Sequence, residues 1–146
     1  MITIKNFLKV KDDFIDIKDF KGTIDEDIYI EGAIIININD VEVMGLAHYD
    51  YILILWNSLV NQINETKLKS ATAINFPDQP TTLLIEPNGQ DLIKLSMDSK
   101  FLSSCNRDEF IQELKASGIN FYLKMKTINP NLKTEIEEML NIIASF

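Results

Sequence analysis

The residues from Ile28 to Met44 constrain the fold more than any other part of the chain. Every second residue from Ile30 to Ile38 is isoleucine or glycine, which is the repeat of a β-strand. Asn39-Asp40 interrupts this pattern, and both residue types tolerate the positive φ angles of a two-residue hairpin turn. We therefore predict a β-hairpin. Its expected cross-strand pairs are Ile38 with Val41, Asn37 with Glu42, and Ile36 with Val43.

The two faces of this hairpin differ in chemistry. One is isoleucine and valine throughout, whereas the other combines an aromatic ring, carboxylates, an amide and apolar groups. Such a mixture is typical of protein-binding surfaces. The candidate partner-binding residues are Tyr29, Glu31, Asn37, Asp40, Glu42 and Met44. The alternative is that another layer, such as residues 1–20, covers this face.

Local signals predict the remaining elements. One or two short strands are expected in residues 1–27. Further strands are expected at Ala71–Phe76, at Thr81–Glu86 and Leu92–Met97 joined across Pro87-Asn88-Gly89-Gln90, and at Ile119–Ile128. Helices are expected at Asp50–Thr66, at Asn106–Ser117 with Gly118 as C-cap, and from Asn129-Pro130 onward. This order predicts an α+β fold, with an antiparallel β-sheet built from hairpins and about three helices packed mainly on one face. A length of 146 residues predicts a single domain, 1–146.

The predicted helix Asp50–Thr66 carries more apolar surface than one stripe. Asp50 is expected as its N-cap or as an acid of its first turn. Its first two turns are apolar nearly all round. Such a helix is packed on two sides or is partly buried in an oligomer, so a homodimer is an open alternative.

The negative charge of the chain is concentrated in one segment. Gly22 to Thr66 contains eight acids and no lysine or arginine, whereas the flanking segments are nearly balanced. The whole net charge of −8 therefore originates in this segment. Charge of one sign can steer a partner of opposite sign, and here it favours a basic protein. It argues against nucleic acid and against an anionic membrane surface, which both need basic patches.

Residues suited to catalysis or metal binding are scarce. His48 is the only histidine and Cys105 the only cysteine, and no metal-ligand spacing connects them. We expect His48 to be a loop residue and Cys105 to be inert beside a helix cap. Asp12-Asp13 and Asp25-Glu26-Asp27 lack the ligand spacing of a calcium loop and are expected to be solvated turns. We therefore predict no catalytic residues, no metal site and no cofactor.

Three short motifs carry a resemblance to known proteins. They are Tyr29-Ile30-Glu31-Gly32, the helical segment Tyr51 to Val60 with its Leu-Trp pair, and Phe76-Pro77-Asp78-Gln79-Pro80. Over residues 28–126 the chain resembles a group of small acidic bacterial proteins. In size and charge it is similar to immunity proteins of bacterial toxin systems, including contact-dependent inhibition. The resemblance implies that a basic toxin domain would be attracted by an acidic surface and blocked.

These observations predict a non-enzymatic binding protein, most specifically an immunity protein for a basic toxin domain. A self-associating structural or adaptor domain is the alternative, and a hydrolase using His48 is a third possibility. Residues 1–7 lack the layout of a signal peptide, and the apolar run Tyr51–Trp56 is too short to span a membrane. We expect a soluble cytoplasmic protein.

Overall fold

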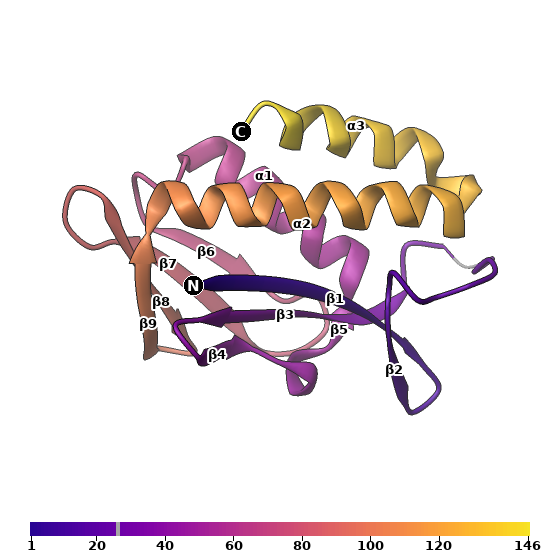
Figure 1. Ribbon diagram of the computed structural model, residues 1–146, viewed down its shortest axis with the longest axis horizontal. Helices are drawn as coiled ribbons and strands as arrows, with labels where there is room; N and C mark the ends of the chain where they lie inside the picture. Colours follow the sequence, from indigo (N-terminus) through magenta and orange to yellow (C-terminus); the bar gives the residue numbers. More distant parts are fainter. Residues whose placement is uncertain (26) are drawn as a thin grey trace.

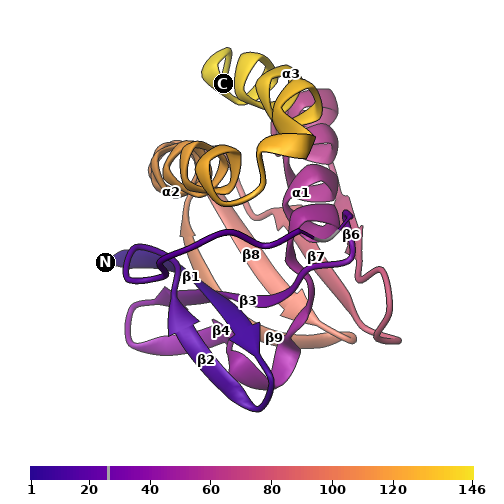
Figure 2. The same cartoon turned by 90° about the vertical axis from the view of Figure 1, so that its right-hand side faces the viewer.

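The computed structural model describes residues 1–25 and 27–146. Within these residues the chain forms two antiparallel sheets of hairpin-linked strands and three α-helices (Figure 1). This confirms the α+β class, with the strands divided between two sheets. The helices gather on one side of the strands (Figure 2). Glu26, which the sequence predicts to belong to a solvated acidic turn, lies outside the described residues.

The first sheet contains the predicted hairpin. Its strand order is β2-β1-β3-β4, and β5 also pairs with β3. The strands are β1 (Ile2–Val10), β2 (Asp13–Asp16), β3 (Glu31–Ile38), β4 (Val41–Met44) and β5 (Asp50–Tyr51). Asn39 and Asp40 have φ angles of 52° and 67°, and the pairs Ile38–Val41 and Asn37–Glu42 form as predicted. The expected strands of residues 1–27 are β1 and β2.

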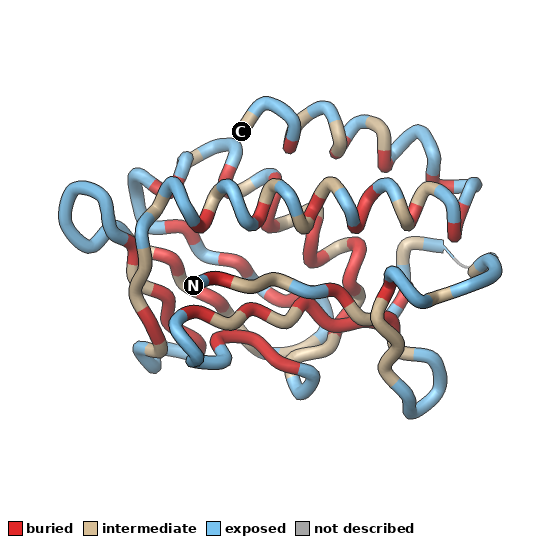
Figure 3. The backbone as a smooth tube through the Cα atoms, in the orientation of Figure 1, coloured by how far each residue is buried: buried red, intermediate tan, exposed pale blue. Residues whose placement is uncertain are grey.

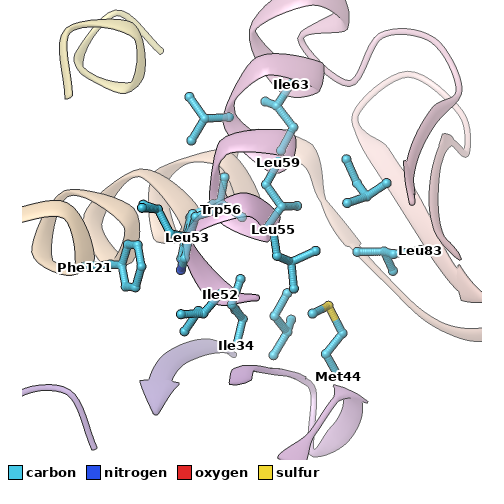
Figure 4. Packing of buried hydrophobic residues seen from close by; sticks show 14 of the residues in the cluster. Ile34, Met44, Ile52, Leu53, Leu55, Trp56, Leu59, Ile63, Leu83 and Phe121 are labelled. Carbon is cyan, nitrogen blue, oxygen red and sulfur yellow. The ribbon is translucent and has the colours of Figure 1, made fainter. Parts of the chain in front are cut away.

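A β-bulge changes the register at the base of this hairpin. Ile36 pairs with Met44, whereas the sequence predicts Val43. The extra residue turns Met44 toward the inner face, on the same side as Ile36. Met44 is only 1% exposed and lies among core side chains (Figure 4). Its predicted place on a partner-binding face is therefore wrong.

The second sheet has the order β6-β7-β8-β9. Its strands are β6 (Thr72–Asn75), β7 (Thr82–Pro87), β8 (Leu92–Met97) and β9 (Lys100–Asn106). The predicted β7–β8 hairpin is confirmed, with Gly89 at φ 90° in its turn. Strand β9 is not predicted by the sequence. It follows β8 through a tight turn at Asp98 and Ser99, whose φ angles are 50° and 70°.

Helix α1 (Ile52–Thr66) packs against strands of both sheets. It contacts β3 and β6 on one side and the C-terminal helix on the other. Its buried residues are Ile52, Leu53, Leu55, Trp56, Leu59, Val60 and Ile63. Figure 3 shows buried positions following α1 and the strands beneath it, and Figure 4 shows the packing around it. The apolar residues at the start of α1 are thus covered by other parts of the same chain. Of the two predicted alternatives, packing on two sides or burial in an oligomer, the structure shows the first.

Helix α2 (Arg107–Ile128) extends about three turns beyond its predicted end at Ser117. Asn106 caps it as expected, with Oδ1 accepting a hydrogen bond from the Glu109 N–H at 2.9 Å. The predicted C-cap at Gly118 and the predicted strand Ile119–Ile128 are both wrong, because the helix continues through Gly118. A Cβ there would lie 2.4 Å from Ile143 Cδ1 and 2.9 Å from Trp56 Cζ3. This glycine therefore permits close packing of three helices rather than ending one.

The chain ends with η2 (Pro130–Leu132) and helix α3 (Lys133–Ala144). The predicted helix start at Asn129-Pro130 is thus confirmed, with a 3-10 turn before the α-helix. Helix α3 packs on α1 and α2. No helix in the described part of the chain is both long and apolar enough to cross a membrane.

Candidate functional site

The structure separates the predicted partner-binding residues into two groups. Tyr29 and Glu31 lie at the start of β3, whereas Asp40 and Glu42 lie at the hairpin turn beyond its end. Asn37 lies six residues along the strand from Glu31, which corresponds to about 20 Å. Asn37, near the turn, is half-buried and paired with Glu42. The predicted residues therefore do not form one continuous site.

The group at the hairpin turn is held by its own chain. Asp40 is exposed, and the neighbouring Asn39 N–H donates to the Met1 carbonyl oxygen at 2.9 Å. The Glu42 side chain folds over Gly45, so closely that a Cβ on Gly45 would lie 2.4 Å from the Glu42 carboxyl carbon. This end offers two exposed carboxylates without an aromatic anchor beside them.

Strand β1 brings basic residues onto the outer face of the first sheet. Lys5 pairs with Ile35, and paired residues of antiparallel strands share a face. Lys9 follows on the same side of β1, with its ammonium 5.1 Å from the centroid of the Tyr49 ring. Residues 1–20 thus extend the sheet at its edge instead of covering the face. The outer face therefore carries charges of both signs. The charged residues of the 22–66 segment are all acidic, and the positive charges come from β1.

At the start of β3, two tyrosines and two carboxylates gather. The rings of Tyr29 and Tyr51 meet edge to face, with centroids 5.2 Å apart and an interplanar angle of 73°. Tyr29 is 56% exposed. Glu31 is exposed and pairs across the strands with Tyr51, and Asp78 is also exposed. We call Tyr29, Glu31, Tyr51 and Asp78 the tyrosine–carboxylate patch.

The electrostatics of Tyr51 show that these groups act on one another. The carboxylate of Asp78, partial burial, and the carboxylates of Glu31 and Asp50 raise the pKa of the Tyr51 hydroxyl above its ordinary value. The cause is that a tyrosinate would be repelled by the neighbouring negative charges. The patch thus combines aromatic surface with a local negative potential, which suits a cationic group from a partner.

The buried side chain of Asp50 holds the backbone segments that carry Tyr51 and Asp78. Its side chain is buried, and its carboxylate accepts hydrogen bonds from three backbone N–H groups. These donors are Tyr51 at 2.6 Å, Asp78 at 3.1 Å and Gln79 at 2.9 Å. The Gln79 side-chain amide in turn donates to the carbonyl oxygens of Ala47 and Tyr49. Asp50 is predicted as the N-cap or a first-turn acid of the helix, and both roles are wrong, because Tyr51 is the N-cap and the first turn carries no acid.

A cavity opens beside the patch. Its volume is about 580 Å³, and Tyr29 and Glu31 form part of its wall. The other walls come from the end of β1 and from the loop that follows β2. The full lining is Lys9, Val10, Lys11, Phe20, Thr23, Ile24, Asp25, Tyr29, Ile30 and Glu31.

His48 and Cys105 have structural surroundings. His48 lies in the 3-10 turn η1 (Leu46–His48), where its Nδ1 accepts from the Gly45 N–H at 3.0 Å. Cys105 lies in β9, and burial raises the pKa of its thiol to about 11, with Glu109 adding to the effect. This thiol stays protonated near neutral pH, which makes it a poor nucleophile. Among the described residues, no group of three or more histidine, cysteine, aspartate or glutamate side chains could hold a metal ion.

The strand pattern predicts half of the patch, Tyr29 and Glu31. Tyr51 and Asp78 are not among the predicted partner-binding residues, although each belongs to one of the short motifs that carry the resemblance. No local periodicity connects residue 51 with residue 78, so those motifs are the one available signal.

Comparisons with known proteins identify no relative: no family model matches the chain, no curated protein matches its sequence, and no solved structure matches its fold. The resemblance to small acidic bacterial proteins, which rests on short motifs, and the likeness to immunity proteins in size and charge both stay predictions.

Proposed function

We propose that this protein is a non-enzymatic binding protein that holds a basic protein domain against the tyrosine–carboxylate patch. In its most specific form the proposal is an immunity protein that neutralises a basic bacterial toxin domain in the cytoplasm. The observation that carries it is the contact between exposed Tyr29 and half-buried Tyr51, with the carboxylates of Glu31 and Asp78 around it.

The two components of the patch support different stages of binding. Carboxylates on a chain of net charge −8 accelerate the encounter with a basic partner, because long-range attraction raises the association rate. Tyrosine rings supply contact area with few rotatable bonds, and such residues commonly dominate the binding energy of an interface. Charges at the edge and aromatic residues at the centre are the usual composition of an interface.

A rigid support makes the patch better suited to tight binding. The Asp50 carboxylate joins the Tyr51 segment to the Asp78–Gln79 turn through backbone hydrogen bonds. Tyr51 and Asp78 are therefore ordered before a partner arrives. Ordering that precedes binding reduces the entropy lost in the complex.

Self-association has less support. Its basis in the sequence was the apolar surface of α1, and α1 is covered by β3, β6 and α3 of the same chain. A monomer at micromolar concentration by light scattering is the result expected from this packing.

The first partner to test is the product of the neighbouring reading frame, because an immunity protein must be made together with its toxin. We expect a complex with a basic domain of that product, with an association rate that falls steeply as NaCl is raised. A neighbouring product without a basic domain, or an association rate independent of salt, would contradict the proposal.

Charge-reversal variants test whether the tyrosine–carboxylate patch is the surface that attracts the partner. Glu31→Lys with Asp78→Lys should slow association at low salt by about tenfold or more. The matched control is Asp91→Lys with Glu113→Lys, which makes the same change of charge in the β7–β8 loop and on α2, away from the patch (Figure 1). Equal slowing by both pairs would mean that net charge, rather than the patch, governs the encounter.

A further inference from the structure

We infer that the cavity beside Tyr29 receives a single arginine side chain of the basic partner, with its guanidinium between the Tyr29 ring and the Glu31 carboxylate. This inference rests on the proposed function and names the anchor that the partner would use. The class of ligand is a planar monocation presented on a protein chain.

The size and position of the cavity suit a partner side chain. Its volume of about 580 Å³ lies in the range of ligand clefts and exceeds the needs of one side chain. Tyr29 and Glu31 belong both to this wall and to the patch, so the cavity continues the proposed interface. A side chain entering from a partner seated on the patch would pass Tyr29 first.

Tyr29 offers a surface for a flat cation. Its edge-to-face contact with Tyr51 fixes the ring, while more than half of the residue stays exposed. A cation within about 6 Å of a tyrosine ring centroid is attracted by the negative face of the ring. Guanidinium also stacks on such rings, which an ammonium does not do.

The carboxylates that line the cavity have oxygens that can still accept hydrogen bonds from a ligand. Glu31 forms no ion pair among the described residues, although Lys9 and Lys11 line the same cavity. Asp25 Oδ1 accepts from Asn131 Nδ2 at 3.0 Å, which leaves its second oxygen. A carboxylate and a guanidinium can form two parallel hydrogen bonds, so Glu31 matches the fork of an arginine.

Two lysines share the cavity wall with the two carboxylates. Lys9 Nζ donates to the Lys11 carbonyl oxygen at 2.7 Å, and the same ammonium lies against the Tyr49 ring. This ammonium is therefore engaged by the Lys11 carbonyl oxygen and the Tyr49 ring, and it forms no ion pair with Glu31 among the described residues. Lys11 lies in the turn between β1 and β2 and brings a second positive charge to the cavity wall. A ligand anion bound at these lysines is the competing outcome of the test.

The test uses three small probes: the N-acetyl amides of arginine, lysine and glutamate. Each is titrated into the ¹⁵N-labelled full chain while amide chemical shifts are followed. We expect the arginine probe to shift Tyr29, Glu31 and Asp25 with millimolar affinity, and the lysine probe to bind several-fold more weakly.

Two conservative variants test the named contacts. Tyr29→Leu should weaken the arginine probe about threefold to fivefold, and Glu31→Gln about fivefold. Glu42→Gln, the same change at the other end of the hairpin, should leave its affinity unchanged. Tyr29 and Glu31 are exposed, so both variants are expected to fold, and far-ultraviolet circular dichroism checks this.

Three results would overturn the inference. They are no shift with the arginine probe, equal binding of arginine and lysine probes, or preferential binding of the glutamate probe at Lys11. The proposed function would survive any of these if a basic partner still bound with a salt-dependent rate. Conversely, arginine binding without any protein partner would leave the cavity assignment standing while the proposed function failed.

Discussion

Replacement of Asp50 by asparagine tests the support of the patch directly. The carboxylate accepts from Tyr51, Asp78 and Gln79, and an asparagine has one oxygen where aspartate has two. With its oxygen at the Oδ1 position, asparagine keeps the bonds from Tyr51 and Asp78. Its amide group then opposes the Gln79 N–H, which bonds to Oδ2 at 2.9 Å in the wild type.

The expected cost follows from this geometry. Loss of one hydrogen bond to a charged group costs about 1.5–3 kcal/mol, and the two retained bonds become weaker because the acceptor is neutral. We expect Asp50→Asn to lower the free energy of unfolding by about 2–4 kcal/mol. The melting temperature should fall by about 5–15 °C for a chain of this length.

The assay combines global and local measurements. Urea unfolding followed by the fluorescence of Trp56 gives the free energy, and hydrogen exchange gives the protection of the Asp78 and Gln79 amides. Asp98→Asn is the matched control, because exposed Asp98 accepts a single bond from the Thr82 N–H at 2.9 Å. If Asp50→Asn costs no more than Asp98→Asn, or leaves the exchange of both amides unchanged, the Asp50 carboxylate does not hold the Asp78–Gln79 turn beside Tyr51.

Two further predictions concern the helices. Gly118→Ala should destabilise the chain by about 1–2 kcal/mol in urea unfolding, because overpacking against Ile143 and Trp56 exceeds the gain in helix propensity. Adding Ile143→Val, which removes Cδ1, should recover part of this loss, whereas a stabilised Gly118→Ala would refute the close contact. Burial raises the pKa of Tyr122, whose hydroxyl donates to Asn57 Oδ1 at 2.7 Å. Stability from this group is present below the unfolded pKa of about 10 and is lost as pH rises further, so urea midpoints should fall above pH ~10 and fall less steeply in Tyr122→Phe.

The elements predicted correctly carry their signals within a few residues. Asn39 and Asp40 form the turn because both accept positive φ, and Asn106 caps α2 through a residue three positions away. Gly118 shows where such reasoning ends. A glycine followed by an apolar segment is typical of a helix C-terminus, but the same residue also allows two helices to approach. Only the positions of Trp56 and Ile143 distinguish these roles, and both are distant in sequence.

Two other features depend on tertiary packing. The bulge in β4 turns Met44 inward, although strict alternation places it outside. Strand β9 contains two serines and an asparagine, yet Ser103 is buried where its hydroxyl lies 3.4 Å from the Ile38 carbonyl oxygen. Its strand conformation therefore depends on the neighbouring sheet more than on its own composition.

The site could be predicted only in part, for a related reason. The 22–66 segment identifies a length of chain with one sign of charge, but electrostatic attraction depends on position in space. Folding separates Glu31 from Asp40 along β3 and brings Lys5 and Lys9 onto the same face. It also brings Asp78, which lies outside that segment, close enough to Glu31 for both to raise the pKa of Tyr51.

The tyrosine–carboxylate patch therefore depends on a link between distant segments. Asp50 is one of the eight acids of the 22–66 segment, but its carboxylate is buried and committed to backbone donors. Its charge thus does less to attract a partner than to hold the Asp78 turn beside Tyr51. An exposed acid can be exchanged for another acid with little effect on attraction, whereas the geometry around Asp50 requires two oxygens at one position. We infer that the steering and positioning roles of this acidic segment are divided between different residues.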